Sequence, residues 1–287
     1  MKVRPLYLLI VFLLVVAFIS FNKFGRSAER TAEVMGTTLR VKVLGEDAEP
    51  LVKEAISEIK RLDKLFSRFD KNSEISLINS MAGKTSVQIS SDTFNIIEMS
   101  VKANRLSRGA FDITLGHPGD LILDKSMRKV CLRKDGEKLD LGGIGKGYAV
   151  ESARRLLLKQ GVKSAIIDMH SSIAVIGNNW RIGIQDPQNN EKILGVIALN
   201  EGDALATSGS YEQPGHIIDP RTGKPADKCL SVTVVGKDAG FADALSTAVF
   251  VLGPVDGMRL VSSLKDVKVL IVDKKGIIYD NFGFKLR

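Results

Sequence analysis

Several patterns that would mark common protein classes are scarce or absent in this chain of 287 residues. It has two cysteines, Cys131 and Cys229, which lie far apart and form no cluster with the spacing of a metal site. They can pair outside the cytosol or remain buried thiols. The formal net charge is +8, but no dense Lys/Arg tract or aromatic-basic stripe accompanies it, so nothing indicates nucleic-acid binding. The charge is compatible with a phosphate-bearing ligand, an anionic membrane surface or a slightly basic soluble domain.

Long apolar runs are missing too, with one exception at the N-terminus. Lys2 and Arg4 precede an unbroken apolar run over residues 6–19, which is long for a signal-peptide core and short for a spanning helix. Bulky residues follow where cleavage needs small ones, and no cysteine stands where lipidation would need one. Positive charge ahead of the run keeps that end cytoplasmic. We expect an uncleaved signal anchor over residues 1–25 with the rest exported; a cleaved signal peptide is the alternative.

The remainder shows no internal repeat, no low-complexity segment and no obvious linker after residue 35. We expect a polar tether over residues 26–34 and one compact domain over 35–287. Helical spacing of apolar residues predicts helices over 48–69, 91–107, 146–161, 241–253 and 255–264. Short apolar or alternating runs predict strands over 37–45, 129–134, 137–143, 164–169, 173–177, 180–184, 193–199, 204–209, 231–236 and 268–273. Because these elements mix without strict βαβ alternation, we expect an α+β fold with a large, mostly antiparallel sheet and packed helices.

A glycine-rich turn, "DLGGIGKGYAVE" over residues 140–151, joins a predicted strand to a helix. Glycines let a ligand approach the backbone, and the free N–H groups of a helix start favour an anion, to which Lys146 would add positive charge. The segment matches neither the Walker nor the Rossmann spacing. Taken alone, it favours a structural turn over a phosphate site.

A carboxylate and a hydroxyl share one face of the predicted helix at 241–253. Asp243 and Thr247 are four residues apart in an otherwise apolar segment. Hard oxygen donors of this kind suit Mg²⁺, which completes its shell with phosphates and water. The alternative is that Asp243 caps the helix and Thr247 bonds back to a carbonyl, and spacing alone favours it.

The stretch "ALATSGSYEQPGHIIDPRTGKPA", residues 204–226, holds one of only three histidines. His216 stands at the end of a short apolar strand that enters a turn, a position from which a group titrating near neutrality can act as general base. A hydrogen-bonded loop histidine is the alternative and the simpler reading of this stretch alone. His117 and His170 show no ligand partner at metal spacing.

In their order and wording, these pieces resemble the ApbE family of flavin transferases, also called FAD:protein FMN transferases. The matching segments span nearly all of residues 35–253: "MGTT" (35–38), "FSRFDKNSEISLIN" (66–79), "GAFDITLG" (109–116), "DLGGIGKGYAVE" (140–151), "ATSGSYE" (206–212), "HIIDPRTGKP" (216–225) and "ADALSTAVFVLG" (242–253). Each is modest alone, and the set is specific.

The resemblance implies an Mg²⁺-dependent enzyme that transfers the FMN half of FAD to a Ser or Thr hydroxyl of a target protein in a membrane redox complex, releasing AMP. It also implies attachment to the inner membrane by the N-terminal segment, with the catalytic domain on the periplasmic side. The metal would be held by the side chains of Asp243 and Thr247 and the carbonyl of Ala149. The FAD contacts would be Met35, Lys146, Ile217 and Phe69, the last where the family commonly has tyrosine. His216 would take the proton of the target hydroxyl.

The chain departs from the family pattern at "MHSS", residues 169–172, where a "GGD"-like turn is usual. Glycines there would permit a close backbone path, so bulkier residues bear on the nucleotide pocket. The segment after residue 116 is also short and lacks the usual aromatic-glycine patch. Two alternatives therefore stay open: an FAD carrier or assembly protein without transfer, and an FAD pyrophosphatase that yields FMN and AMP.

Overall fold

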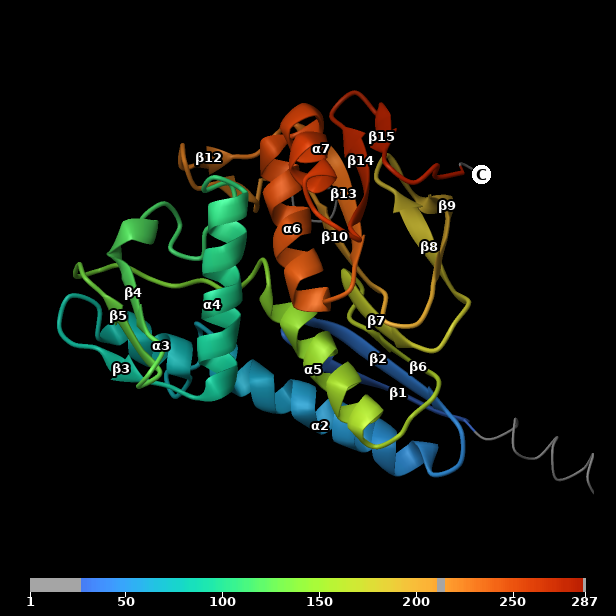
Figure 1. The fold of residues 1–287 in the computed structure, drawn as a ribbon, viewed down its shortest axis with the longest axis horizontal. Helices are drawn as coiled ribbons and strands as arrows, with labels where there is room; N and C mark the ends of the chain where they lie inside the picture. Colours follow the sequence, from blue (N-terminus) through green and yellow to red (C-terminus); the bar gives the residue numbers. More distant parts are fainter. Residues whose placement is uncertain (1–26, 211–214, 286–287) are drawn as a thin grey trace, which may run out of the picture.

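A computed structural model describes residues 27–210 and 215–285, built around one eight-stranded sheet in which all neighbouring strands are antiparallel (Figure 1). The strands, in order across the sheet, are β1 (Ser27–Val34), β2 (Thr37–Leu44), β6 (Ala165–Asp168), β7 (Ser172–Ile176), β10 (Ala204–Gly209), β13 (Cys229–Gly236), β14 (Lys268–Asp273) and β15 (Ile278–Asp280). The predicted α+β fold with a large antiparallel sheet is confirmed.

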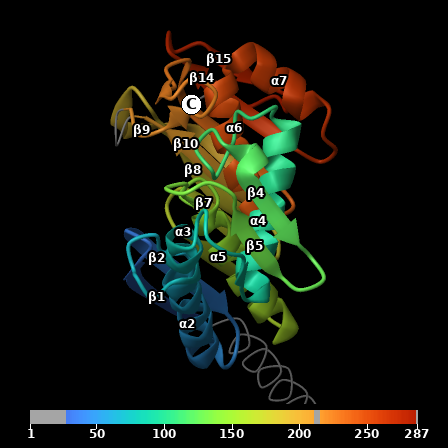
Figure 2. The same ribbon diagram turned by 90° about the vertical axis from the view of Figure 1, so that its left-hand side faces the viewer.

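Helices cover one face of this sheet, and α3 (Glu74–Ser80) and α4 (Ser91–Leu106) pack against other helices. The helices in contact with the strands of the sheet are α2 (Ala48–Phe66), α5 (Gly145–Lys159), α6 (Ala239–Leu252) and α7 (Pro254–Ser262). The first forms because Val52, Ala55, Ile59 and Leu62 recur at helical spacing, and all four are completely buried. Figures 1 and 2 both show α6 above α5, and the start of α5 contacts the first half of α6 in front of the middle strands. This contact positions the site described below.

The opposite face of the sheet packs against a hairpin, β8 (Trp180–Asp186) and β9 (Asn189–Leu199). Successive residues of a strand point to opposite faces, so Ile167 faces the helices and Ile166 faces the hairpin. Two smaller sheets complete the fold: β3 (Val87–Gln88), β5 (Lys129–Leu132) and β4 (Leu121–Asp124), and the pair β11 (Ile218–Asp219) and β12 (Lys224–Pro225).

The polar tether predicted for residues 26–34 is wrong over residues 27–34, which form the edge strand β1. All eight residues pair with β2, from Ser27 opposite Leu44 to Val34 opposite Thr37. Of the eight, Val34 alone is buried, so the segment lacks the alternation by which a strand is recognised. Backbone pairing makes it a strand despite its polar side chains.

The strand predicted for residues 137–143 is also absent, although Leu139 and Leu141 are buried as an alternating pattern requires. The backbone of Leu139 pairs with a side chain in place of a strand. The amide of Asn79 donates to its carbonyl at 3.1 Å and accepts its N–H at 2.7 Å. One asparagine thus satisfies the backbone groups that a neighbouring strand would otherwise satisfy.

The predicted signal anchor lies outside the described residues. Within residues 27–210 and 215–285, no helix has the length and apolar character needed to cross a membrane.

Candidate active site

Asp243 is a carboxylate buried in the helix layer. On α6 it is 4% exposed, and its Oδ2 accepts the N–H of Gly147 at 2.9 Å. The helix is capped by another residue, because the side chain of Asp238 accepts the N–H of Phe241 at 2.9 Å. The reading of Asp243 as a helix cap is therefore wrong. A buried carboxylate on an apolar helix needs a partner that offsets its lost hydration.

Burial raises the pKa of Asp243, because the ionised carboxylate loses its hydration there. Three groups act in the opposite direction and favour the anion: the ammonium of Lys146, the N–H of Gly147 and the hydroxyl of Ser172. A cation bound beside this carboxylate would favour the ionised form in the same way.

The glycine turn before α5 brings backbone against α6. A Cβ on Gly147 would lie 2.3 Å from the carbonyl oxygen of Ala239 and 2.5 Å from the Cβ of Asp243, so only glycine permits this approach. A Cβ on Gly143 would lie 3.2 Å from Thr247 Oγ1. The turn that sequence reasoning treated as structural thus lies directly against the predicted metal residues.

Ala149, predicted to offer its carbonyl to the metal, lies deeper in α5 and is completely buried. Regular helix geometry directs that carbonyl to the N–H four residues on. Gly143, which the sequence did not single out, is the backbone position beside Thr247.

Hydroxyl groups surround Thr247. Its Oγ1 lies 3.1 Å from the Oγ of Ser208 on β10, which lies 2.8 Å from the Oγ of Ser246. Ser246 in turn donates to the carbonyl of Asp243 at 2.9 Å. The predicted back-bond from Thr247 to a carbonyl is replaced by this contact with the neighbouring strand.

The "MHSS" turn between β6 and β7 reaches the same place. Ser171 Oγ and Ser172 Oγ are buried, and neither has hydrogen-bond geometry with any group in the described part of the chain. Ser172 is completely buried and close enough to Asp243 to affect its pKa. His170 has a φ of 66°, in the left-handed region that glycine favours. The turn therefore holds a non-glycine residue in a left-handed conformation and directs two hydroxyls to the interior.

His216 and Ile217 lie beside the pair β11–β12. Ile217 is half-buried against the apolar cluster formed by α6 and β13, and its carbonyl accepts the N–H of Ala226 at 2.8 Å. His216, one residue earlier, is exposed. The side chain of Arg221 donates twice to Asp219, at 2.8 and 2.7 Å, which holds the turn. The packing of Ile217 thus fixes the position of the backbone next to His216, whose side chain is exposed.

Phe69 is 82% exposed, an unusual setting for so large an apolar ring. The guanidinium of Arg68 lies 4.2 Å from the ring centroid and also pairs with Asp140 at 3.2 Å. Asp140 accepts the N–H of Gly142 at 2.8 Å. These contacts join Phe69 to the glycine turn and leave its ring accessible.

Met35 and Gly36 form the tight turn between β1 and β2, with φ values of 50° and 70°. This is a type I′ arrangement, for which asparagine and glycine are preferred. The N–H of Met35 donates to Asp63 Oδ2 at 3.3 Å. A methionine at positive φ is uncommon and points to a role that its shape serves.

We expect Met35→Asn to raise the free energy of unfolding by about 0.5–1 kcal/mol, because asparagine tolerates the left-handed turn better. The same change should weaken FAD binding about tenfold, through the loss of apolar contact worth about 1.5 kcal/mol. Urea titration and calorimetry with FAD measure the two effects. Gly36→Ala is the matched control and should destabilise the same turn. A less stable Met35→Asn protein with unchanged FAD affinity would contradict both expectations.

A second group of potential metal ligands was missed by sequence reasoning. His117, Asp120 and Glu137 place one ligand atom each within 4.8 Å of one another. His117 and Asp120 are three residues apart, but Glu137 lies 17 residues further along the chain, and no spacing pattern connects it to them. Lys134 donates to Asp120 at 2.7 Å and lowers the pKa of that carboxyl, while burial raises the pKa of Glu137. The ammonium of Lys134 thus already neutralises the charge of Asp120 in this group.

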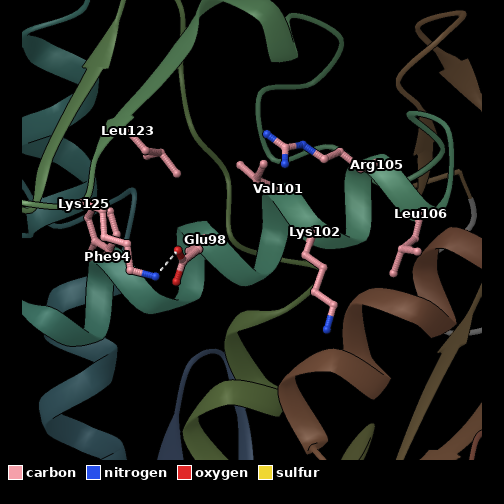
Figure 3. A pocket seen from close by; sticks show the side chains of 8 residues that line it. All are labelled: Phe94, Glu98, Val101, Lys102, Arg105, Leu106, Leu123 and Lys125. Carbon is pink, nitrogen blue, oxygen red and sulfur yellow. Dashed lines mark hydrogen bonds and ion pairs between the residues drawn. The ribbon is translucent and has the colours of Figure 1, made fainter. Parts of the chain in front are cut away.

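A groove of about 480 Å³ runs along α4. Figure 3 shows Lys125 paired with Glu98 across it, at 2.9 Å, and Lys102 directed toward α6. No predicted site residue lines the groove. The candidate site is instead the place where α5, α6, β7 and β10 meet.

Comparison with known proteins identifies the family of the chain. The model of the ApbE family matches residues 35–128 and 117–271. The FAD:protein FMN transferase of Klebsiella pneumoniae is 29% identical over 85% of this chain and 88% of its own length, and that of Escherichia coli K12 is 27% identical over 85% and 83%. The crystal structure of the ApbE protein of Thermotoga maritima superposes with a TM-score of 0.82 at 28% identity, covering 90% of this chain and 97% of that one. With the matches extending over most of its length, this chain belongs to the ApbE family.

Proposed function

We propose that this protein is an FAD:protein FMN transferase that requires Mg²⁺. The observation that carries the proposal is the pair of buried Asp243 and half-buried Thr247, held against the glycine turn that begins α5. The names of the relatives support the same activity. FAD is the substrate, and a second protein supplies the acceptor hydroxyl.

The oxygen donors at this place fit Mg²⁺. They comprise one carboxylate, the hydroxyl of Thr247 and the hydroxyl of Ser172, which is buried and unsatisfied among the described residues. Hard oxygen ligands with one carboxylate are the set that Mg²⁺ prefers when phosphates complete its shell. We propose Gly143, next to Thr247, as a backbone contributor in place of Ala149. When bound, Mg²⁺ would neutralise charge on the pyrophosphate of FAD.

Each remaining residue has a role that its position supports. Lys146, at the start of α5, would pair with a phosphate of FAD, and the helix start adds favourable N–H groups. Met35, Phe69 and Ile217 would contact the apolar parts of the dinucleotide. His216 would accept the proton of the acceptor hydroxyl as its oxygen attacks the phosphorus of the FMN half. The bond from that phosphorus to the bridging oxygen breaks, and AMP leaves with the bridging oxygen. Such a transfer depends chiefly on alignment and charge stabilisation.

We further propose that residues 1–25 anchor the protein in the inner membrane, with residues 27–287 on the periplasmic side. The basic residues ahead of the apolar run support this orientation. The acceptor would then be an exported part of a membrane redox complex that carries the Ser or Thr.

The proposal is tested by incubating the purified chain with FAD, Mg²⁺ and candidate acceptor domains, followed by intact mass spectrometry. The expected result is an acceptor heavier by one FMN, together with free AMP. Free FMN and AMP in the absence of acceptor would instead identify a pyrophosphatase. Bound FAD that survives without turnover would identify a carrier, and either result would overturn the proposed transfer.

A further inference from the structure

The hydroxyl groups beside Thr247 form a chain whose direction can be deduced. It runs from Thr247 through Ser208 and Ser246 to the backbone carbonyl of Asp243, with separations of 3.1, 2.8 and 2.9 Å. Each hydroxyl owns one proton and can donate only once, whereas a carbonyl oxygen can only accept. These limits leave one arrangement that satisfies all three contacts.

The direction follows from the carbonyl end. Ser246 must donate to the carbonyl of Asp243, so its contact with Ser208 can be a hydrogen bond only if Ser208 donates. The single proton of Ser208 is then used, and its contact with Thr247 requires Thr247 to donate. In the reverse order Ser246 would donate to Ser208, and its 2.9 Å contact with the carbonyl of Asp243 would set two oxygen lone pairs against each other inside a buried site.

The consequence falls on Thr247. Its proton is directed toward β10, so the lone pairs of Oγ1 are left for the side that faces Gly143 and the α5 turn. A hydroxyl that binds a cation must point its proton elsewhere, because the cation repels it. Replacing an outer group that fixes the orientation of a metal ligand typically lowers metal affinity about 10- to 100-fold.

We propose that Ser208 is a positioning residue that, with Ser246 behind it, orients Thr247 to bind the cation through oxygen lone pairs alone. The inference rests on the proposed function, since it assumes the metal site at Asp243 and Thr247. The burial of the chain supports it: Ser246 is completely buried and Ser208 is 8% exposed, so water does not readily replace either partner. The neighbour of Ser208 on the strand, Thr207, bonds with Thr233 at 2.9 Å and takes no part in the chain.

The test measures Mg²⁺ affinity by isothermal titration calorimetry, with thermal melting of the metal-free proteins to confirm folding. Ser208→Ala should raise the Mg²⁺ dissociation constant about 10- to 100-fold. Thr207→Ala, a hydroxyl removed from the adjacent position, should leave it unchanged. In a Thr247→Ala background, Ser208→Ala should have no further effect, because the ligand that it orients is gone.

The outcomes separate the inference from the function. Folded Ser208→Ala protein that binds Mg²⁺ as the unaltered chain does would overturn the inference and leave the proposed function standing. Equal losses in both backgrounds would also overturn it, because they would indicate a general structural role. If Ser208→Ala does not fold, Ser246→Ala serves in its place, with a weakened Mg²⁺ affinity expected and an unchanged one refuting the chain. Absence of Mg²⁺ binding by the unaltered chain would overturn both inference and metal-dependent function.

Discussion

Replacing Asp243 by asparagine is expected to abolish Mg²⁺ binding and to lower FMN transfer by about 10³-fold or more, while making the metal-free protein more stable. Mg²⁺ binding and FMN transfer are lost because the site loses its one buried carboxylate, and with it the charge that attracts the cation. The metal-free protein becomes more stable because an amide oxygen can still accept the Gly147 N–H while avoiding the desolvation of an anion.

The pH dependence of stability should change in parallel. The folded state raises the pKa of Asp243, so the folded protein holds this proton more tightly than the unfolded chain does. Without metal, the contribution of Asp243 to stability should therefore be highest below the unfolded pKa of about 4 and should fall as the pH rises toward the raised folded value. In Asp243→Asn this component should disappear.

Urea titrations across pH and Mg²⁺ calorimetry test both expectations. The matched control is Asp256→Asn, which removes an exposed carboxylate on α7 that pairs with Arg259 at 2.7 Å. Its Mg²⁺ affinity and transfer rate should equal those of the unaltered chain. Retention of Mg²⁺ binding by Asp243→Asn would place the cation elsewhere and refute the proposed site.

Replacing His216 by glutamine should lower the rate of FMN transfer by about 10²- to 10⁴-fold, the range for loss of a general base, while FAD and Mg²⁺ still bind. The histidine is exposed at the end of the segment that Ile217 anchors, so its removal should not disturb the core. Single-turnover transfer followed by mass spectrometry, combined with FAD calorimetry, separates the two properties.

His117→Gln is the matched control, an exposed histidine that we place outside the transfer site. It should transfer FMN at the normal rate. A His216→Gln protein with unimpaired transfer would mean that another group, or water, takes the proton of the acceptor. Loss of FAD affinity in the same variant would instead make His216 a binding residue.

The sequence predicted those features that follow from local spacing. The four-residue interval between Asp243 and Thr247 places both on one helical face, and in the structure both lie against the glycine turn. The glycine turn was correctly placed at the start of a helix, but the sequence did not show which segment packs against it. That segment is α6, because a Cβ on Gly147 would clash with Ala239 and Asp243, almost a hundred positions later.

What escaped prediction depended on tertiary contacts. Ser208 orients Thr247 from a strand about forty residues earlier, and no periodicity connects two such positions. The backbone of Leu139 is satisfied by the side chain of Asn79, which imitates a strand that is absent. The polar strand β1 was overlooked because pairing with β2, and not burial of its own side chains, makes it a strand.

That strand has a consequence for how far the enzyme can reach. If residues 1–25 lie in the membrane, strand β1 starts only two positions after the anchor, at Ser27. The eight residues of β1 extend roughly 25 Å to the turn at Met35, where the flavin is expected to lie. The strand would then fix the distance between the membrane surface and the flavin site, whereas a flexible linker would allow a range of distances. Acceptor residues at a similar distance from the membrane would be modified, and acceptor residues close to the lipid surface would not.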